Sequence, residues 1–407
     1  MRIAIVGAGV AGAIMARGLA QLPGLDVTCL ERVAPDDQAE AGTGLNIGPN
    51  AVGALSRVDA ELANAITAAA LPWDTWRVTL TDGTELMNIR MRDVAPSAGW
   101  RLRWSELYRV LRQGADGLIR YGADITDMGP TGDGSGRTFL RWTDATGAHA
   151  LDDIDLLIGV DGRFSKVRQR FAGDAKARQV GVAIFRTLLA DTSEGVINDY
   201  EQWFNRDNRL LGFRVPPDHI YISGTFPISV GGDITDAHKA REALREAYTP
   251  SDGTLSEQGQ WLVEAVCNPT TNLHWARLQE SEVRIFEPDS DVLYLGDSSH
   301  GMVPTLGQGA TQAIEGSCTA LMVIRDLVAA GNFDPREWLG AVSDARAARI
   351  RFVMNFSLEA SDTLLAGSDP VAGTLKKTEP AFQSKLKQLY HDFDATWPLQ
   401  GQERAAQ

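Results

Sequence analysis

Hydrophobic residues near the N-terminus fall into short unbroken runs and one longer stretch in which small residues are mixed with apolar ones. Arg2 to Val6 is a short run rich in β-branched residues, which is typical of a buried parallel strand. The stretch through Leu22 favours a helix, and Asp26 to Leu30 is a second strand-like run. The pattern therefore predicts a strand, a turn, a helix and a second strand at the start of the chain.

The predicted turn contains Gly7, Gly9 and Gly12 in the spacing G-x-G-x-x-G. In such a unit the first glycine permits the tight turn, the second lets the backbone approach a pyrophosphate, and the third lets helix and strand pack closely. The helix start adds unpaired N–H groups and partial positive charge. Glu31 follows the second strand, 24 residues after Gly7, where a carboxylate accepts hydrogen bonds from a ribose hydroxyl. The segment predicts a dinucleotide site, and the acid favours FAD or NAD over NADP.

A second informative segment lies in the middle of the chain, where Leu156 to Val160 forms an apolar run. Asp161 and Gly162 follow it directly, and a helix is predicted from about Ser165. Doubly wound folds place ligands at the carboxyl ends of parallel strands, so Asp161 is a candidate cofactor contact. The alternative is structural, because Asp161 could instead cap the helix that follows the turn.

The third segment begins with another short apolar run, Val292 to Leu295, and reaches Asp297 one residue after it. The Asp297 carboxylate at a strand end suits a ribityl or ribose hydroxyl. The next loop contains Pro304, and a long helix rich in small residues then starts around Gly307, Gln308, Gly309 and Ala310. N–H groups at this start would stabilise negative charge on a reduced flavin ring. The alternative is a loop before a helix with no ligand.

In this order, the three segments resemble the single-component (class A) FAD-dependent aromatic hydroxylases, the para-hydroxybenzoate-hydroxylase-like flavoprotein monooxygenases. They are similar to the family's ADP-binding fingerprint, its DG motif and its GD motif, and residues 41–55 resemble a family loop that runs beside the flavin. The resemblance covers most of residues 1–60, 100–175 and 285–350. It implies that FAD is bound by Gly7, Gly9, Ala11, Gly12, Glu31, Arg32, Gly44, Arg103, Asp161, Gly162, Asp297, Pro304, Gly307, Gln308, Gly309 and Ala310.

One position departs from the family pattern. The family usually has an Arg at the start of an R-x-D/E-L element, where it contacts FAD, but here the sequence runs Trp104-Ser105-Glu106-Leu107. Trp104 occupies the arginine's place, and Arg103 lies one residue earlier. We expect Arg103 to reach the cofactor from a shifted start, with stacking by Trp104 as the alternative.

The resemblance implies an α/β fold with a Rossmann-like FAD-binding domain of the GR2 type, an inserted mixed β-sheet domain for the substrate and a helical C-terminus. The middle of the chain agrees with an inserted sheet, because strand-like runs on both sides of a turn at residues 216–218 are followed by two helical stretches. We expect the FAD domain at residues 1–72, 100–177 and 281–365, the substrate domain at 73–99 and 178–280, and a helical tail at 366–407.

The activity implied by the resemblance is the hydroxylation of a small aromatic or N-heteroaromatic substrate, such as a phenol or a hydroxypyridine carboxylate. NADH or NADPH would act as a transient co-substrate that reduces tightly but non-covalently bound FAD, and a flavin C4a-hydroperoxide formed with O2 would transfer the hydroxyl group. Pro304 would limit how the loop over the flavin bends, and Tyr221 would relay a proton.

Substrate contacts are expected from residues on the inserted sheet, although strand aromatics usually fill a core. The candidates are Arg186, Trp203, Phe213 and Tyr221. Two other functions remain open: an FAD oxidoreductase of the same fold that acts on an isoprenoid or polyketide, and a non-catalytic nucleotide-binding module.

The net charge and the cysteine content limit which partners and which cellular compartment are expected. The formal net charge of −14 disfavours binding to nucleic acid or to an anionic membrane surface. Three cysteines that lie far apart predict neither a metal site nor a disulfide framework, and they favour a reducing cytoplasm. Four glycines and Arg17 interrupt the apolar N-terminal stretch, so we expect no signal peptide and no membrane anchor.

We therefore expect a cytoplasmic monomer or homodimer. Its pocket should be locally positive, since an aromatic acid and NAD(P)H are anions. The candidate sources of this charge are the two helix starts at Gly9 and Gly309 and the side chains of Arg103, Arg163, Lys166, Arg168 and Arg186.

Overall fold

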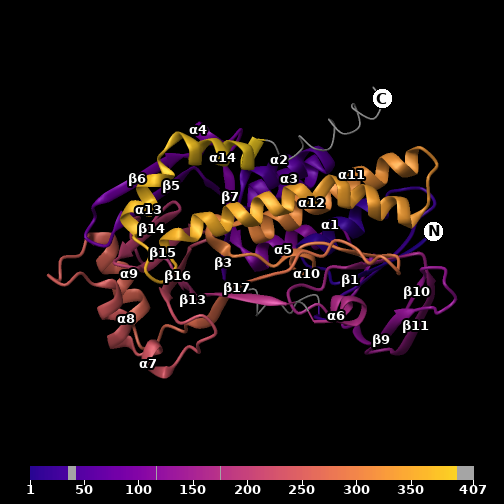
Figure 1. The fold of residues 1–407 in the computed structure, drawn as a ribbon, viewed down its shortest axis with the longest axis horizontal. Helices are drawn as coiled ribbons and strands as arrows, with labels where there is room; N and C mark the ends of the chain where they lie inside the picture. The colour runs from indigo at the N-terminus through magenta and orange to yellow at the C-terminus, as the bar shows by residue number, and fades with distance from the viewer. Residues whose placement is uncertain (35–42, 116, 175, 392–407) are drawn as a thin grey trace.

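The computed structural model describes residues 1–34, 43–115, 117–174 and 176–391, and its elements are arranged around two large β-sheets (Figure 1). Residues 392–407 of the expected tail, and residues 41 and 42 of the loop expected beside the flavin, lie outside the described residues. Two long helices, α11 (Gln308–Ala329) and α12 (Pro335–Glu359), pack side by side along the long axis of the molecule (Figure 1).

The first sheet consists of five parallel strands in the order β18-β12-β1-β2-β8. Residues 3–5 of β1 are fully buried, as expected for a strand that is covered on both faces. Because β12 lies between β1 and β18, the carboxyl ends of the three strands that precede the glycine-acid motifs are neighbours. The strands are β1 (Arg2–Val6), β2 (Asp26–Leu30), β8 (Ile119–Arg120), β12 (Leu156–Gly159) and β18 (Val292–Tyr294).

One face of this sheet is covered by helices whose apolar sides form the largest core of the molecule. Close packing of α1 on α11 depends on a glycine, since a Cβ on Gly18 would lie 2.5 Å from a methyl carbon of Leu321. These helices are α1 (Val10–Leu19), α2 (Pro49–Val58), α3 (Ala60–Ala69), α5 (Trp104–Arg112) and α11.

The other face packs against an antiparallel three-stranded sheet that the sequence analysis did not anticipate. Leu140 and Trp142 of this sheet are buried against Leu157 of β12 and Tyr294 of β18. Its strands are β9 (Asp124–Pro130), β10 (Thr138–Asp144) and β11 (Gly147–Ile154), and α6 (Lys166–Ala172) lies beside them.

The second large sheet has seven strands in the order β17-β13-β16-β15-β14-β5-β6. It is mixed, because β14 pairs in parallel with β5 whereas the other neighbours are antiparallel. Two antiparallel strands from an earlier part of the chain, β5 and β6, join this sheet at one end. Its strands are β5 (Thr75–Leu80), β6 (Glu85–Arg90), β13 (Ala177–Ala190), β14 (Glu201–Asn205), β15 (Asn208–Val215), β16 (His219–Pro227) and β17 (His274–Ser281).

Side chains on the two faces of the seven-stranded sheet belong to two different cores. One face packs against α8 (Arg241–Tyr248) and α9 (Glu257–Cys267), which follow α7 (Asp236–Lys239). The other face packs against the loop before α11 and the C-terminal helices. The latter are the end of α12, the 3₁₀ turn η3 (Ala360–Thr363), α13 (Pro370–Lys377) and α14 (Pro380–His391).

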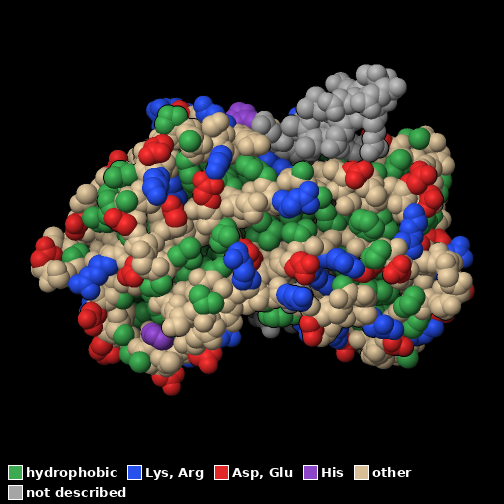
Figure 2. Space-filling model, viewed as in Figure 1, with side chains coloured by type: hydrophobic (Ala, Val, Ile, Leu, Met, Phe, Trp, Pro, Cys, Tyr) green, Lys and Arg blue, Asp and Glu red, His purple; other side chains and the backbone are tan. Residues whose placement is uncertain are grey.

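A small sheet connects the two halves, formed by β3 (Gly44–Ile47), β7 (Gly99–Arg103) and β4 (Leu71–Trp73), with α4 (Met91–Val94) following β6. On the face seen in Figure 2, Lys and Arg side chains are interspersed with Asp and Glu side chains over the whole surface. Among the described helices, none has an apolar stretch long enough to cross a lipid bilayer.

Candidate active site

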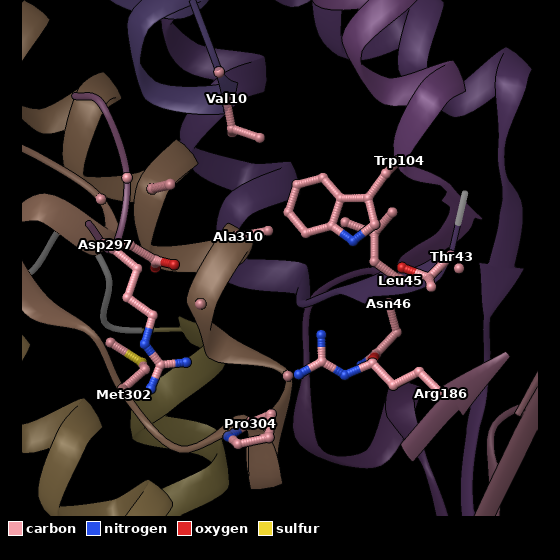
Figure 3. Close-up of a pocket in the computed structure, with 18 of the residues that line it drawn as sticks. Val10, Thr43, Leu45, Asn46, Trp104, Arg186, Asp297, Met302, Pro304 and Ala310 are labelled. Carbon is pink, nitrogen blue, oxygen red and sulfur yellow. The ribbon is translucent and has the colours of Figure 1, made fainter. Parts of the chain in front are cut away.

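A cavity of about 370 Å³ lies where the carboxyl ends of β1, β12 and β18 meet the inner face of the seven-stranded sheet (Figure 3). The loops after these three strands all contribute to its wall, together with the 3₁₀ turn η2 (Pro304–Leu306), the start of α11 and the start of α5. Predicted site residues that line it are Gly9, Ala11, Gly44, Gly162, Arg186, Tyr221, Asp297, Pro304, Gly307, Gly309 and Ala310.

Two bare helix starts face the cavity. Apart from the local backbone, no atom of the described residues lies within 4 Å of the position that a Cβ would take on Gly9 or on Gly309. The residues before α1 and α11 are glycines, Gly9 and Gly307, so no side chain caps the first turn of either helix. The first N–H groups of both helices therefore remain available to an anionic or carbonyl oxygen of a ligand.

Two glycines of the first motif act within the protein rather than on the cavity. Gly7 has φ of +101°, and a Cβ there would lie 2.6 Å from the carbonyl oxygen of Val160. A Cβ on Gly12 would lie 1.9 Å from the carbonyl oxygen of Gly7. Side chains at either position would push the turn, α1 and the end of β12 apart, so both glycines permit the close packing that places Gly9 at the cavity.

Glu31 does not line the cavity, and its carboxylate is used by the backbone around it. It accepts hydrogen bonds from the N–H groups of Ala8, at 2.6 Å, and Val33, at 3.1 Å. Arg112 lies 3.8 Å from the same carboxylate. Glu31 therefore supports the glycine turn, and Arg32, which follows it, is exposed and lines no part of the cavity.

The two aspartates of the later motifs differ in position. Asp161 accepts hydrogen bonds from the hydroxyl of Ser165 and from the N–H of Val167. It therefore holds the start of α6, as the structural alternative predicts, while the next residues, Gly162 and Arg163, reach the cavity. The side chain of Asp297 faces the cavity (Figure 3). Enclosure by protein raises the pKa of its carboxyl, and nearby Arg163 opposes this shift.

Gln308 lies beneath the cavity wall, fully buried. Its side-chain oxygen accepts hydrogen bonds from Asn50 and from Gln312, each at 3.1 Å. Both partners also donate to Glu315, which forms ion pairs with two buried arginines of α12, Arg346 and Arg349. The network fixes the first turns of α11 against α2 and α12, so Gln308 positions the loop rather than lining the cavity.

Tyr200 and Tyr221 contribute polar groups to the sheet side of the cavity. Arg186 lies on the same side (Figure 3). The phenol oxygen of Tyr200 accepts a hydrogen bond from the Gln202 amide at 2.9 Å, which leaves its own proton free to be donated. Burial raises the pKa of Tyr221, and the nearby Arg186 guanidinium and a hydrogen bond with Ser223 oppose this shift.

Arg209 also lines the cavity, although it was not among the residues predicted from the sequence. Its residue is 3% exposed, and among the described residues it has neither a hydrogen bond nor an ion pair through its guanidinium. Burial lowers its pKa, while the phenols of Tyr200 and Tyr221 lie close enough to oppose this. A buried unpaired cation is unfavourable, so Arg209 calls for an anionic partner inside the cavity.

Two predicted substrate contacts, Trp203 and Phe213, do not line the cavity, which corrects their expected placement. Strand side chains alternate between the two faces of a sheet. Trp203 therefore points toward α8 and α9, opposite to Tyr200 and Gln202. Phe213 is on the cavity side but lies behind the tyrosines, with its ring centroid 5.7 Å from that of Tyr200 and 5.0 Å from that of Tyr221.

The same alternation would have found Arg209. In the antiparallel ladder Phe213 pairs with Tyr221 and Leu211 pairs with Ser223, so the next residue on that face is Arg209. Counting back in twos from Phe213 places Arg209 on the sheet face that carries Tyr221, without any structure.

At the start of α5 the expected assignment is reversed. Trp104, rather than Arg103, lines the cavity, and its indole points into it (Figure 3). Arg103 ends β7, where it pairs with Gly44, and its buried Nε atom has no hydrogen-bond partner in the part of the chain that the structure describes. Of the other predicted cations, Arg163 and Arg186 reach the cavity, whereas Lys166 pairs with Asp124 and Arg168 binds backbone carbonyls.

Comparisons with characterised proteins identify related sequences over most of the chain, although no family model matches it. A 3-amino-4-hydroxybenzoate 2-monooxygenase from Streptomyces platensis is 28% identical over 377 residues, which cover 88% of this chain and 87% of that protein. A 6-hydroxynicotinate 3-monooxygenase from Pseudomonas fluorescens is 26% identical, with 77% and 80% covered. A salicylate hydroxylase from Pseudomonas putida is 27% identical, with 92% and 88% covered.

Two solved structures share the fold of this chain. Klebsiella pneumoniae HpxO, complexed with FAD and uric acid, superposes with a TM-score of 0.77 at 18% identity, covering 96% of both chains. The 2,6-dihydroxypyridine-3-hydroxylase from Arthrobacter nicotinovorans superposes with a TM-score of 0.70 at 19% identity, covering 94% of this chain and 95% of that one. At these identities the structures show a shared fold.

Proposed function

We propose that this chain, a homologue of the FAD-dependent aromatic hydroxylases, is itself an FAD monooxygenase that hydroxylates a small aromatic or N-heteroaromatic substrate. The observation that carries the proposal is the convergence of the three motif segments on one cavity that continues to a set of tyrosines and arginines. In the overall reaction, ring C–H, O2, NAD(P)H and a proton give ring C–OH, NAD(P)+ and water.

The residues present fit FAD. The bare start of α1 at Gly9 would offer N–H groups to the pyrophosphate, and the bare start of α11 at Gly309 would offer them to the carbonyl edge of the flavin ring. When bound, FAD supplies the chemistry that activates O2 for transfer to the ring. The chain must then orient the substrate, exclude water and move protons.

Apolar side chains support the exclusion of water from the inner part of the cavity. Ile184 and Leu211 project from the seven-stranded sheet, and Leu278 comes from its edge strand β17. Met302 and Pro304 approach from the loop before α11 (Figure 3). A dry pocket strengthens each polar interaction inside it and protects reactive intermediates from hydrolysis.

The polar side chains of the sheet suit a substrate that carries an ionisable hydroxyl and an acid. Tyr200 can donate its proton because Gln202 already donates to its oxygen, and Tyr221 lies next to it. These phenols can hold or relay the proton of a substrate hydroxyl. Arg209, buried and without a partner among the residues that the structure describes, would pair with the substrate's anionic group, and Arg186 adds positive charge at the edge.

We also propose the domain roles expected from the resemblance. Residues 1–72, 100–177 and 281–365 would form the Rossmann-like, GR2-type FAD-binding domain. Residues 73–99 and 178–280 would form the inserted substrate domain, and the helical tail would begin at 366. The arrangement of the five-stranded and seven-stranded sheets on opposite sides of the cavity supports this division.

The test begins with the purified protein and its bound cofactor. We expect yellow protein that releases FAD on denaturation and oxidises NADH or NADPH faster when a hydroxybenzoate or a hydroxypyridine carboxylate is present. With ¹⁸O2, the product should carry one labelled oxygen. Protein that neither contains nor binds FAD would refute the proposal. Oxidation that responds only to isoprenoids or polyketides would instead support the alternative FAD oxidoreductase.

A further inference from the structure

Helix α5 presents Trp104, Tyr108 and Arg112 along one face, because residues four positions apart lie one above the other on a helix. The ring centroids of Trp104 and Tyr108 are 5.5 Å apart with an angle of 41° between the planes. The Arg112 guanidinium carbon lies 4.9 Å from the centroid of the Tyr108 ring. The three side chains therefore form one continuous stripe, which we call the α5 stripe.

The α5 stripe runs from the cavity to the glycine turn. Trp104 and Tyr108 line the cavity, on the wall that also contains Gly44 and Asn46. At the other end, Arg112 donates from Nε to the carbonyl oxygen of Ala8 at 3.0 Å. The stripe therefore borders the path between the turn at Gly9 and the centre of the cavity.

Arg112 is the cationic member of the α5 stripe. Its guanidinium already interacts with the backbone of the glycine turn and with the Glu31 carboxylate. Its side chain is 9% exposed. Burial raises the pKa of Tyr108 to about 12, so its phenol stays neutral at physiological pH. Trp104 has no hydrogen bond through its indole N–H among the described residues, and its ring points into the cavity (Figure 3). The cavity end of the stripe thus offers an aromatic face and one free N–H donor, without a charge.

We propose that Trp104 holds FAD by aromatic contact, at the position where the resembled family uses an arginine, and that Arg112 is a positioning residue that joins α5 to the glycine turn. The proposal rests on the FAD binding proposed above. An aromatic contact combines burial of a large apolar surface with a directional interaction between π systems. It also explains why Arg103, whose side chain is outside the cavity, does not have to reach the cofactor.

The proposal is tested by titrating the apoprotein with FAD and following the loss of free flavin fluorescence. We expect the Kd for FAD to rise at least about tenfold in Trp104→Ala and to stay within about threefold of the wild type in Trp104→Phe. Trp104→Leu, which fills the space without a ring, should behave like Trp104→Ala. Arg103→Gln changes the neighbouring cation outside the cavity and should leave the Kd unchanged.

The outcomes distinguish the aromatic contact of Trp104 with FAD from the proposed monooxygenase function. The melting temperature of each apoprotein shows whether the variant is folded, and Trp104→Leu replaces Trp104→Ala if the latter does not fold. As a second readout, FAD should quench more tryptophan emission in the wild type than in Trp104→Phe. A wild-type Kd in Trp104→Ala or Trp104→Leu, or a larger loss in Arg103→Gln, would overturn the aromatic contact and leave the monooxygenase proposal standing. A wild type that does not bind FAD would refute the proposed function itself.

Discussion

Arg209→Met should make the substrate-free enzyme more stable and at the same time weaken substrate binding. Arg209 is buried in the cavity wall without a hydrogen bond or ion pair among the described residues. Methionine has a similar reach and no charge, so it removes a desolvated cation without leaving a large void. A residue that serves only the fold would not show effects of opposite sign.

The magnitudes follow from the burial of the charge. Replacing a buried charged arrangement with apolar side chains stabilises proteins by about 1–3 kcal/mol. For a chain of 407 residues, an unfolding entropy of about 2.1 cal/mol/K per residue converts this into a rise in Tm of about 1–4 °C. Loss of one partner from a buried charge pair costs about 2–5 kcal/mol of binding free energy, which is roughly 30-fold to several thousand-fold in Kd.

The assay uses the FAD-loaded enzyme without NAD(P)H. The Tm is measured at one scan rate, and the substrate Kd is read from the change in flavin absorbance. Arg214→Met is the matched control, because Arg214 is on the same strand, pairs with Asp191 at 2.7 Å and has a 37% exposed side chain. A partly exposed pair of this kind contributes about 1 kcal/mol or less, and substrate binding should not change.

The reasoning would be refuted if Arg209→Met lowered the Tm and left the substrate Kd unchanged. That result would mean that the guanidinium stabilises the sheet and has no role toward the substrate. Arg209→Lys keeps the charge but loses the planar fork, so it should retain part of the affinity and none of the gain in Tm.

Three further changes test other parts of the site. Gly309→Val places a branched side chain in a space at the cavity where only the local backbone now lies within 4 Å, so the Kd for FAD should rise at least about tenfold by fluorescence titration. Gly340 is a similarly open position on α12, and Gly340→Val should leave the Kd unchanged. Glu31→Lys removes the acceptor of the Ala8 and Val33 N–H groups and places a cation beside Arg112, so FAD content and the Tm should both fall; unaltered FAD content would reject a role for Glu31 in the cofactor site. Burial, together with nearby Arg346, lowers the pKa of His300 to about 4. As the pH falls, the unfolded chain therefore binds this proton before the folded chain does. The free energy of unfolding should be constant above about pH 6.5 with respect to this group and should decrease by up to about 3 kcal/mol toward pH 4. His300→Gln should flatten the denaturant-unfolding profile between pH 6.5 and 4.5 relative to the wild type, whereas His274→Gln, at an exposed position, should not; equal slopes in wild type and His300→Gln would contradict the assignment.

The sequence by itself determined the local units that form the cofactor side of the cavity. Strand, glycine turn and helix follow one another within a few residues, and the atom that a Cβ on Gly12 would meet first is the carbonyl oxygen of Gly7 in the same motif, whereas Gly7 itself packs against Val160 at the end of a distant strand. For the same reason, Pro304 and the helix start at Gly309 are on the cavity as expected. The sheet of β9, β10 and β11 was missed because charged residues interrupt its strands and leave only weak alternation.

Only the tertiary structure decided which side chains face the cavity on its other walls. Trp104 rather than Arg103 faces the cavity because the direction of a side chain at a strand-to-helix junction depends on how β7 and α5 pack. The sequence pattern does not specify this packing. Trp203 lies outside the cavity because pairing of β14 with β15 and β5 places its side chain on the opposite face of the sheet. Arg209 lines the cavity because pairing of β15 with β16 places its side chain on the cavity face. Whether such a cation pairs with a carboxylate depends on residues from distant strands, and among the described residues no carboxylate pairs with Arg209.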